Sequence, residues 1–250
     1  MVTNGRTPIG GLTAADFELR DNGVLQSVEL LASETPINAV LALDISSSTD
    51  GQRQADLQRA GEALLSGLGA GDRAALTTFN QAVTLRMPLS TDLAAVRASL
   101  TRIVPSGETA MMDGLFVALT TTYTQPGRSL VVVCTDGNET SSWLTAGEVL
   151  EAAKRSNAVV YAVTTAQGGT PPDITNVAEA TGGQALQVGS GAALGAAFQR
   201  ILSDFRSRYV LAFTPAGVDP GGWHRLEVRV KRPGLSTRAR PGYVGVSARR

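Results

Sequence analysis

The chain alternates between unbroken apolar runs and segments in which apolar residues recur every three or four positions. Residues 39–43, 74–79, 130–135 and 159–164 form apolar runs of strand length, which are typical of parallel strands covered on both faces. Three amphipathic helical faces are expected, made by Leu57, Ala60, Leu64 and Leu68, by Met112, Phe116, Leu119 and Tyr123, and by Leu194, Phe198, Ile201 and Phe205. The alternation predicts an α/β fold, a doubly wound and mostly parallel sheet flanked by helices.

Two further segments refine this prediction. Val83, Leu85 and Met87 alternate with polar neighbours, which indicates an antiparallel edge strand paired with residues 74–79. Residues 145–148 have the sequence Thr-Ala-Gly-Glu, a capping box that predicts a helix through about residue 155.

Both ends of the chain depart from the alternation of strand and helix. Residues 16–20 and 24–30 flank an Asp-Asn-Gly sequence at 21–23, which is a strong hairpin turn. Apolar and charged residues alternate over 226–230, as in a strand with one face in water. We therefore expect the two ends to pair into one small antiparallel β unit. The expected boundaries are 1–35 and 208–250 for the β unit and 36–207 for the α/β domain.

Composition excludes several classes of function. The 22 basic and 22 acidic residues balance, so there is no electrostatic case for binding nucleic acid or an anionic membrane. No apolar run approaches the roughly 18 residues that span a bilayer. Cys134 is the only cysteine, which rules out an intrachain disulfide and a cysteine-rich zinc site, and we expect it to be a buried hydrophobe. Residues 1–5 do not resemble a signal peptide, so we expect a fragment of a longer precursor.

Polar residues follow the first apolar strand directly. Asp44, Ser46 and Ser48 occupy alternate positions where the run 39–43 stops. A carboxylate and two hydroxyls form half of a cage for a hard cation, because oxygen ligands with few charges suit Mg²⁺, Mn²⁺ or Ca²⁺ rather than zinc.

Two later segments can complete the cage. Thr109 opens the helical run 110–123, and Asp136 ends the strand 130–135. In an open α/β sheet, the carboxyl ends of strands and the N-termini of helices converge on one edge, the usual ligand-binding edge. The five side chains expected to meet there are Asp44, Ser46, Ser48, Thr109 and Asp136.

These three fragments resemble the metal-ion-dependent adhesion site of von Willebrand factor A domains. The pattern consists of D-x-S-x-S at 44–48, a downstream Thr that opens a helix, and T-D-G at 135–137 after a valine-rich strand. The resemblance covers roughly residues 37–205. The lead-in at 4–26 and the closing segments Tyr-Val-Leu at 209–211 and Arg-Ala-Arg-Pro-Gly-Tyr at 238–243 are similar to those of bacterial VWFA-related domain proteins.

The resemblance implies a metal-dependent module that binds a protein ligand. Asp44 and Asp136 would offset the charge of the cation, most favourably Mg²⁺. Ser46, Ser48 and Thr109 would alternate between direct and water-mediated contact, and Asp136 would often reach the ion through water. An open position would take an Asp or Glu of the partner. The family also implies an exported protein, in the periplasm, secreted or at the cell surface.

Three residues near these segments are candidates for a partner-binding rim. Glu108 and Glu139 are near enough to add charge to the rim, although the plainer interpretation of both is a solvated loop side chain. Trp143 is either an anchor for the partner, since aromatic residues are enriched at interface hot spots, or a residue packed under the following helix.

Two other functions are compatible with these residues. A metal-assisted hydrolase or phosphoesterase could use the same cation to activate water, but it needs a general base. His224, the only histidine, lies in the C-terminal β region, and we expect it to have a structural or surface role. No G-x-S-x-G elbow is present. The other alternative is a scaffold whose site is filled by its own acidic loop. We therefore expect a binding module without enzymatic activity.

Overall fold

The structure is a computed structural model that describes residues 1–31, 35–49, 51–136, 139–165 and 169–246. The chain divides into two compact units. One unit is continuous, Pro36–Leu202, and the other joins Met1–Thr35 with Ser203–Arg250. The division after residue 202 falls inside a helix that continues to Arg206.

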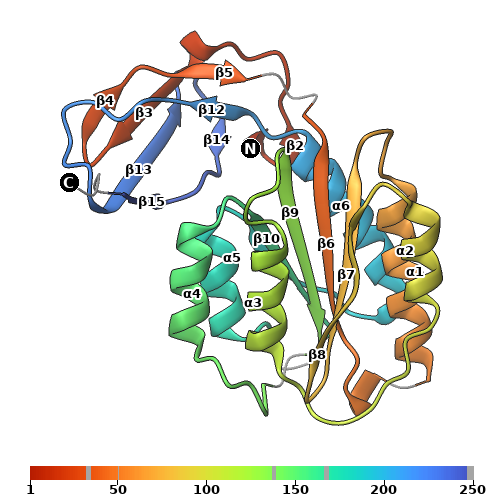
Figure 1. Cartoon of the computed structure of the whole chain (residues 1–250). Coiled ribbons are helices and arrows are strands. Elements are labelled where there is room, and N and C mark those ends of the chain that lie inside the picture. Colours follow the sequence, from red (N-terminus) through yellow and green to blue (C-terminus); the bar gives the residue numbers. More distant parts are fainter. Residues whose placement is uncertain (32–34, 50, 137–138, 166–168, 247–250) are drawn as a thin grey trace. The chain divides into compact units, whose positions relative to one another are not determined.

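The continuous unit is built on one mixed sheet with the strand order β11-β10-β9-β6-β7-β8 (Figure 1). Its strands are β6 (Ile37–Asp44), β7 (Arg73–Phe79), β8 (Val83–Ser90), β9 (Arg128–Thr135), β10 (Val159–Thr164) and β11 (Gln184–Gln187). Every residue of β6 is buried, as its unbroken apolar sequence requires for a central strand. β8 alone among these runs antiparallel to its neighbour, β7. Both the parallel sheet and the antiparallel edge strand are therefore confirmed.

Helices cover both faces of this sheet. They are α1 (Gln52–Ser66), α2 (Leu93–Leu100), α3 (Met111–Thr121), α4 (Ala146–Arg155), α5 (Pro172–Ala180) and α6 (Leu194–Arg206), with short 3₁₀ turns η2 (Ser47–Thr49) and η3 (Gly191–Ala193). Figure 1 shows α3, α4 and α5 on one face and α1 and α2 on the other. The Thr145–Glu148 capping box starts α4 as expected. No helix in the described parts of the chain is both long and apolar enough to cross a bilayer.

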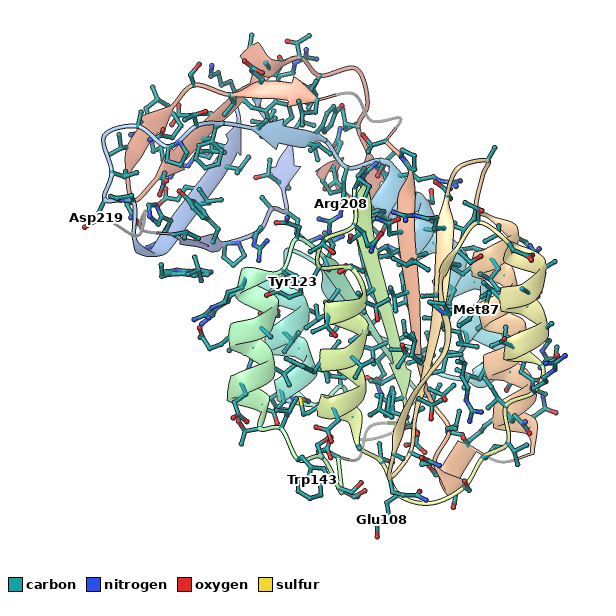
Figure 2. The ribbon with its side chains drawn as sticks, viewed as in Figure 1. Met87, Glu108, Tyr123, Trp143, Arg208 and Asp219 are labelled. Atoms are coloured by element: carbon teal, nitrogen blue, oxygen red, sulfur yellow. The ribbon has the colours of Figure 1, made fainter. Side chains whose placement is uncertain are left out.

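The prediction that Tyr123 belongs to the apolar face of α3 is wrong. Met112 and Leu119 are buried, but α3 ends at Thr121 and the Tyr123 side chain is 45% exposed (Figure 2). The backbone N–H of Thr122 bonds to carbonyls of the preceding turn, so the last turn closes before Tyr123 can join the apolar face.

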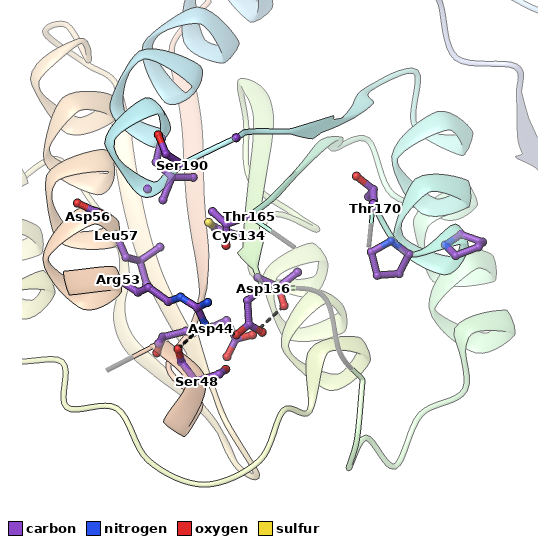
Figure 3. A pocket seen from close by; sticks show the side chains of 18 residues that line it. Asp44, Ser48, Arg53, Asp56, Leu57, Cys134, Asp136, Thr165, Thr170 and Ser190 are labelled. Atoms are coloured by element: carbon purple, nitrogen blue, oxygen red, sulfur yellow. Dashed lines mark hydrogen bonds and ion pairs between the residues drawn. The ribbon is translucent and has the colours of Figure 1, made fainter. Parts of the chain in front are cut away.

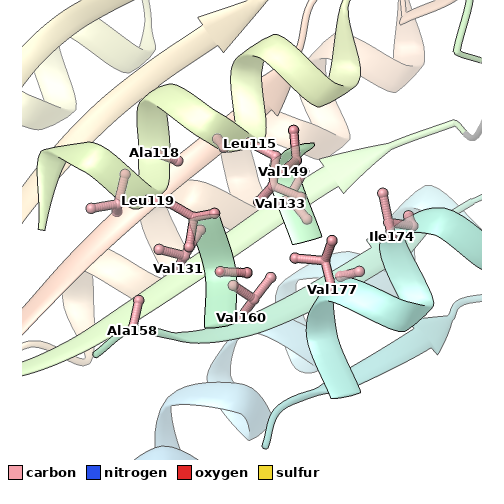
Figure 4. Close-up of a cluster of buried hydrophobic side chains, with 14 of the residues drawn as sticks. Leu115, Ala118, Leu119, Val131, Val133, Val149, Ala158, Val160, Ile174 and Val177 are labelled. Atoms are coloured by element: carbon pink, nitrogen blue, oxygen red, sulfur yellow. The ribbon is translucent and has the colours of Figure 1, made fainter. Parts of the chain in front are cut away.

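Branched apolar side chains fill the space between the sheet and α3, α4 and α5 (Figure 4). Val131 and Val133 of β9 and Val160 of β10 are fully buried against Leu115 and Val177. Complete burial of one such side chain stabilises the fold by about 1.5–3 kcal/mol. This packing fixes where each strand ends, and it is at the strand ends that the candidate site lies.

One glycine permits close packing of the chain against β10. A Cβ built on Gly183 would lie 1.7 Å from the carbonyl oxygen of Val160, and backbone cannot move aside as a flexible side chain can. We expect Gly183→Ala to lower the free energy of unfolding by about 3 kcal/mol, the upper range of overpacking. Gly147→Ala is the control, because in α4 it meets nothing closer than 3.9 Å and alanine favours a helix. An unchanged urea midpoint for Gly183→Ala would contradict this packing.

The second unit consists of antiparallel sheets formed by both ends of the chain. The strand orders are β15-β13-β3-β4, β14-β1-β2 and β12-β5. Their bounds are β1 (Val2–Asn4), β2 (Thr7–Pro8), β3 (Phe17–Asp21), β4 (Val24–Gln26), β5 (Glu29–Leu31), β12 (Val210–Ala212), β13 (Gly222–Val230), β14 (Ser236–Thr237) and β15 (Gly242–Gly245), and η1 (Ala14–Asp16) precedes β3. The predicted pairing of the two termini is confirmed.

The hairpin turn of this unit adopts the expected conformation. Asn22 and Gly23 have φ angles of 46° and 84°, as a type I′ turn requires. The strand expected over 24–30 is instead two short strands, because β4 pairs with β3 whereas β5 pairs with β12.

His224 is a buried structural residue of this unit. Its Nδ1 lies 2.9 Å from Oδ1 of Asp21, and both side chains are almost fully buried. The Tyr243 hydroxyl donates to Oδ2 of Asp21 at 2.8 Å. Burial and this bond to Asp21 raise the pKa of Tyr243 to about 12. The network joins β3, β13 and β15, so it links the N-terminal and C-terminal parts of the unit.

Candidate metal centre

Two parallel neighbouring strands end in the candidate carboxylates. β6 ends at Asp44, and β9 ends at Thr135, one residue before Asp136. The register pairs Leu43 with Cys134, so the chain reaches the same edge of the sheet at Asp44 and at Asp136. The structure therefore brings together the two charged residues that the sequence indicated.

Asp44 is held in one orientation by the protein itself. Its side chain is almost fully buried; Oδ1 accepts a hydrogen bond from the backbone N–H of Ser46 at 2.9 Å, and Oδ2 accepts one from the Thr135 hydroxyl at 2.7 Å. Burial raises the pKa of Asp44, and the neighbouring charge of Asp136 adds to this, while the bonds from Ser46 and Thr135 act in the opposite direction. The net result is a pre-oriented carboxylate that lacks a full counter-charge.

The two serines lie beside one another in the turn after β6. Their hydroxyl oxygens are 3.0 Å apart. The turn is closed by Thr49, whose backbone N–H and hydroxyl both donate to the carbonyl of Ser46. Two hydroxyls at this spacing, next to a fixed carboxylate, are suited to neighbouring positions around one small cation.

Thr109 lies in a loop that contacts this turn. Ser47 N–H donates to the Gly107 carbonyl at 2.9 Å, and Ser106 N–H donates to the Ile45 carbonyl at 2.8 Å. The helix expected from residue 110 begins at Met111 with Ala110 as its N-cap, so Thr109 precedes the cap. Its hydroxyl makes no hydrogen bond to the other four candidate ligands among the described contacts, although its loop is fixed beside them.

A cavity of about 800 Å³ opens at this edge of the sheet (Figure 3). Asp44, Ser48 and Asp136 line it, whereas Ser46 and Thr109 do not. Arg53, in the first turn of α1, also lines the cavity and bonds to the backbone of Ser48. Hydroxyl and carboxylate oxygens are thus accessible from one side.

The donor set fits a hard divalent cation. No group of three or more His, Cys, Asp or Glu side chains that could hold a metal occurs within the described ranges, so a site here depends on two carboxylates supplemented by neutral hydroxyls. That combination suits Mg²⁺ or Mn²⁺, which accept few charged ligands and retain water. At such a site, Asp44 and Asp136 would supply the charge, and Ser46, Ser48 and Thr109 would supply the hydroxyls.

The three rim candidates differ in their environments. Glu108 is exposed, and Trp143 is 93% exposed and projects from the unit (Figure 2). The interpretation of Trp143 as packed under α4 is therefore wrong. The loop is held in place because the Asp113 carboxylate accepts the backbone N–H groups of both Trp143 and Leu144.

The Glu139 carboxylate accepts hydrogen bonds from its own loop and from the start of α3. One carboxylate oxygen accepts the backbone N–H groups of Ser141 and Ser142, and the other accepts the Ser142 hydroxyl and the Met112 N–H in the first turn of α3. A contact between Glu139 and a partner would have to replace some of these bonds.

Three residues of this region were not identified from the sequence. Thr135 orients Asp44, Arg53 reaches Asp136, and Asp113 holds the Trp143 loop. Only Thr135 carries a sequence signal, because it directly precedes Asp136 in the T-D-G motif. Arg53 and Asp113 are ordinary polar positions of helices, and only the fold brings them to the site.

Comparison with known proteins matches part of this chain to a described family. Residues 39–139 match the family model described as von Willebrand factor type A domain. Comparison with curated proteins gives no match.

Solved structures with the same fold include a von Willebrand factor type A protein from Catenulispora acidiphila, with a TM-score of 0.61 and 19% identity over 78% of this chain and 47% of that one. The PilB minor pilin from Streptococcus sanguinis aligns with a TM-score of 0.58 and 14% identity over 71% of this chain and 63% of that one. The von Willebrand factor domain of the type V pili tip protein Mfa5 from Porphyromonas gingivalis aligns with a TM-score of 0.53 and 15% identity over 68% and 95%. This chain thus spans about half of the Catenulispora protein.

Proposed function

We propose that this chain, in which residues 39–139 match the model of the von Willebrand factor type A domain, is a binding module that captures an acidic residue of a partner protein through a divalent cation. The observation that supports this most strongly is the fixed Asp44 carboxylate next to the paired hydroxyls of Ser46 and Ser48. All three side chains lie at the carboxyl edge of the sheet, where open α/β folds bind their ligands.

Each residue has a separate part in the proposed site. Asp44 is oriented by Thr135 and Ser46, so it can contact a cation without first losing conformational freedom. Ser46 and Ser48 offer oxygens without adding charge, and the Thr109 loop is fixed beside them. When bound, the cation, Mg²⁺ in the first instance, supplies an electrophilic centre for a carboxylate. Since this side of the site borders a cavity, an acidic side chain of a partner can approach it.

We favour binding over hydrolysis because the polar groups that could serve as a base are engaged. Both oxygens of Asp44 accept hydrogen bonds, and His224 is buried against Asp21. Activation of water needs a base within hydrogen-bond reach of the nucleophile. The rim supports recognition, because Trp143 is exposed on a loop that is already ordered by Asp113, which lowers the entropic cost of burying it in an interface.

The proposed setting is outside the cytoplasm. Two of the similar structures are named as a minor pilin and a pilus tip protein, and adhesion at a cell surface is consistent with capture of an acidic residue. We extend this setting to the present chain by analogy of fold.

The proposal predicts that cation and carboxylate bind cooperatively. Mn²⁺ binding to the wild-type chain, measured by electron paramagnetic resonance of the free ion, should be several-fold tighter in acetate than in chloride at equal ionic strength. The reason is that acetate can take the position proposed for the partner's carboxylate, and linkage requires each ligand to strengthen the other. Absence of Mn²⁺ binding, or equal affinity in both salts, would contradict the proposal. Turnover of ester, phosphoester or peptide substrates that requires both Mn²⁺ and Asp44 would favour the hydrolase.

A further inference from the structure

Arg53 places a permanent positive charge next to the candidate metal ligands. Its Nη1 donates to the Ser48 carbonyl at 2.8 Å and lies 3.5 Å from Oδ2 of Asp136 (Figure 3). The first contact anchors the guanidinium over the D-x-S-x-S turn, and the second directs it to a carboxylate of the site. A guanidinium stays protonated in proteins, so this charge is present at every physiological pH.

This charge acts on the candidate ligands rather than on another acidic group. Among the described residues that line the cavity, Arg53 is the only cationic side chain, and Asp44, Asp56 and Asp136 are the acidic ones. Asp56 already contacts Gln52 and Arg59. The charge of Arg53 therefore acts mainly on Asp136 and also on Asp44, which lies next to Asp136.

Arg53 reduces the net negative charge of the candidate site. The two carboxylates and the guanidinium together carry about one negative charge, so a divalent cation would make the site net positive and an incoming carboxylate would neutralise it. Unlike charges a few ångströms apart attract by several times the thermal energy in a partly shielded site, and like charges repel equally. Arg53 thus opposes the cation on its own and favours the anion that follows it.

We propose that Arg53 couples the two binding events, so that the site holds a divalent cation weakly by itself and firmly once a carboxylate is present. This inference rests on the proposed function and identifies the residue that sets its cooperativity. The Arg53 side chain is 61% exposed, so it can also move aside or turn towards the incoming carboxylate without disturbing the core.

The test compares Mn²⁺ affinity in chloride and in acetate for four proteins. Arg53→Gln is expected to bind Mn²⁺ about tenfold more tightly than wild type in chloride and to lose most of the enhancement by acetate. Arg53→Lys, which keeps the charge, should stay within about threefold of wild type. Arg97→Gln is the matched control, because it removes the same charge from a surface ion pair with Glu62 and should behave as wild type. Higher ionic strength should reduce the effect of Arg53→Gln.

The measurements distinguish failure of this inference from failure of the proposed function. If wild type binds Mn²⁺ more tightly in acetate but Arg53→Gln matches Arg97→Gln, the coupling role of Arg53 is wrong and the proposed function stands. If Arg53→Lys behaves as Arg53→Gln does, charge is not the cause and the inference is overturned. If wild type binds no Mn²⁺ in either salt, both the proposed function and this inference are wrong. Melting curves of the four proteins confirm that each is folded.

Discussion

Asp44→Asn is expected to abolish the stabilisation of the chain by Mg²⁺ or Mn²⁺. A ligand at one hundred times its dissociation constant stabilises a folded protein by about 2.7 kcal/mol, and this gain should disappear because Asp44 is the buried carboxylate of the proposed site. The amide keeps the size of the side chain and its acceptor oxygen, so the bond from either Ser46 or Thr135 can remain. Thermal unfolding with and without the cation measures the difference.

Without metal, the same substitution should leave stability unchanged or raise it at neutral pH. Burial raises the pKa of Asp44, so the ionised side chain costs stability above that pKa, and the cost disappears as pH falls through it. Asparagine removes the cost at neutral pH. For the same reason, cation binding by wild type should weaken as pH falls through the raised pKa of Asp44. This weakening should begin at a higher pH than it would for an exposed aspartate. Equal stabilisation of wild type and Asp44→Asn by Mg²⁺ would exclude Asp44 as a ligand.

Asp21→Ala is expected to lower the free energy of unfolding of the β unit by about 1–3 kcal/mol, the usual cost of leaving a buried polar group without its hydrogen-bond partner. The substitution removes the carboxylate that both the buried His224 Nδ1 and the partly buried Tyr243 hydroxyl contact. Urea unfolding followed by the fluorescence of Trp223, the neighbour of His224 in β13, reports on this unit.

The control for Asp21→Ala is Glu18→Gln on the same strand. Glu18 pairs with Arg20 at 2.9 Å in a partly exposed position, and such pairs contribute at most about 1 kcal/mol. Similar losses for the two variants would mean that the Asp21 network does not hold β3, β13 and β15 together.

The sequence predicted the fold well where hydrophobic periodicity is strong. The runs that became β6, β7, β9 and β10 are continuous and apolar because each strand is covered on both faces. Missed elements have weaker patterns. α5 contains only nine residues and begins at Pro172, and β11 at the edge of the sheet is only four residues long and partly exposed.

Individual site residues were predictable only where they follow a strand or form part of a motif. Asp44 and Asp136 could be placed because parallel strands deliver their last residues to one edge. The position of Arg53 depends on how α1 packs over the turn after β6, and that arrangement leaves no mark on local sequence. Trp143 likewise remained ambiguous, because exposure is decided by the path of its loop, which Asp113 sets from α3.

The most direct test of the metal-dependent binding site is a crystal structure with Mn²⁺, measured for anomalous scattering. We predict one strong anomalous peak at the carboxyl edge of the sheet, within coordination distance of the Ser46 and Ser48 hydroxyls and close to Asp44, with a carboxylate from acetate or a neighbouring molecule at an open position. No peak at this edge at millimolar Mn²⁺, in crystals where the site is accessible to solvent, would contradict a cation-based function.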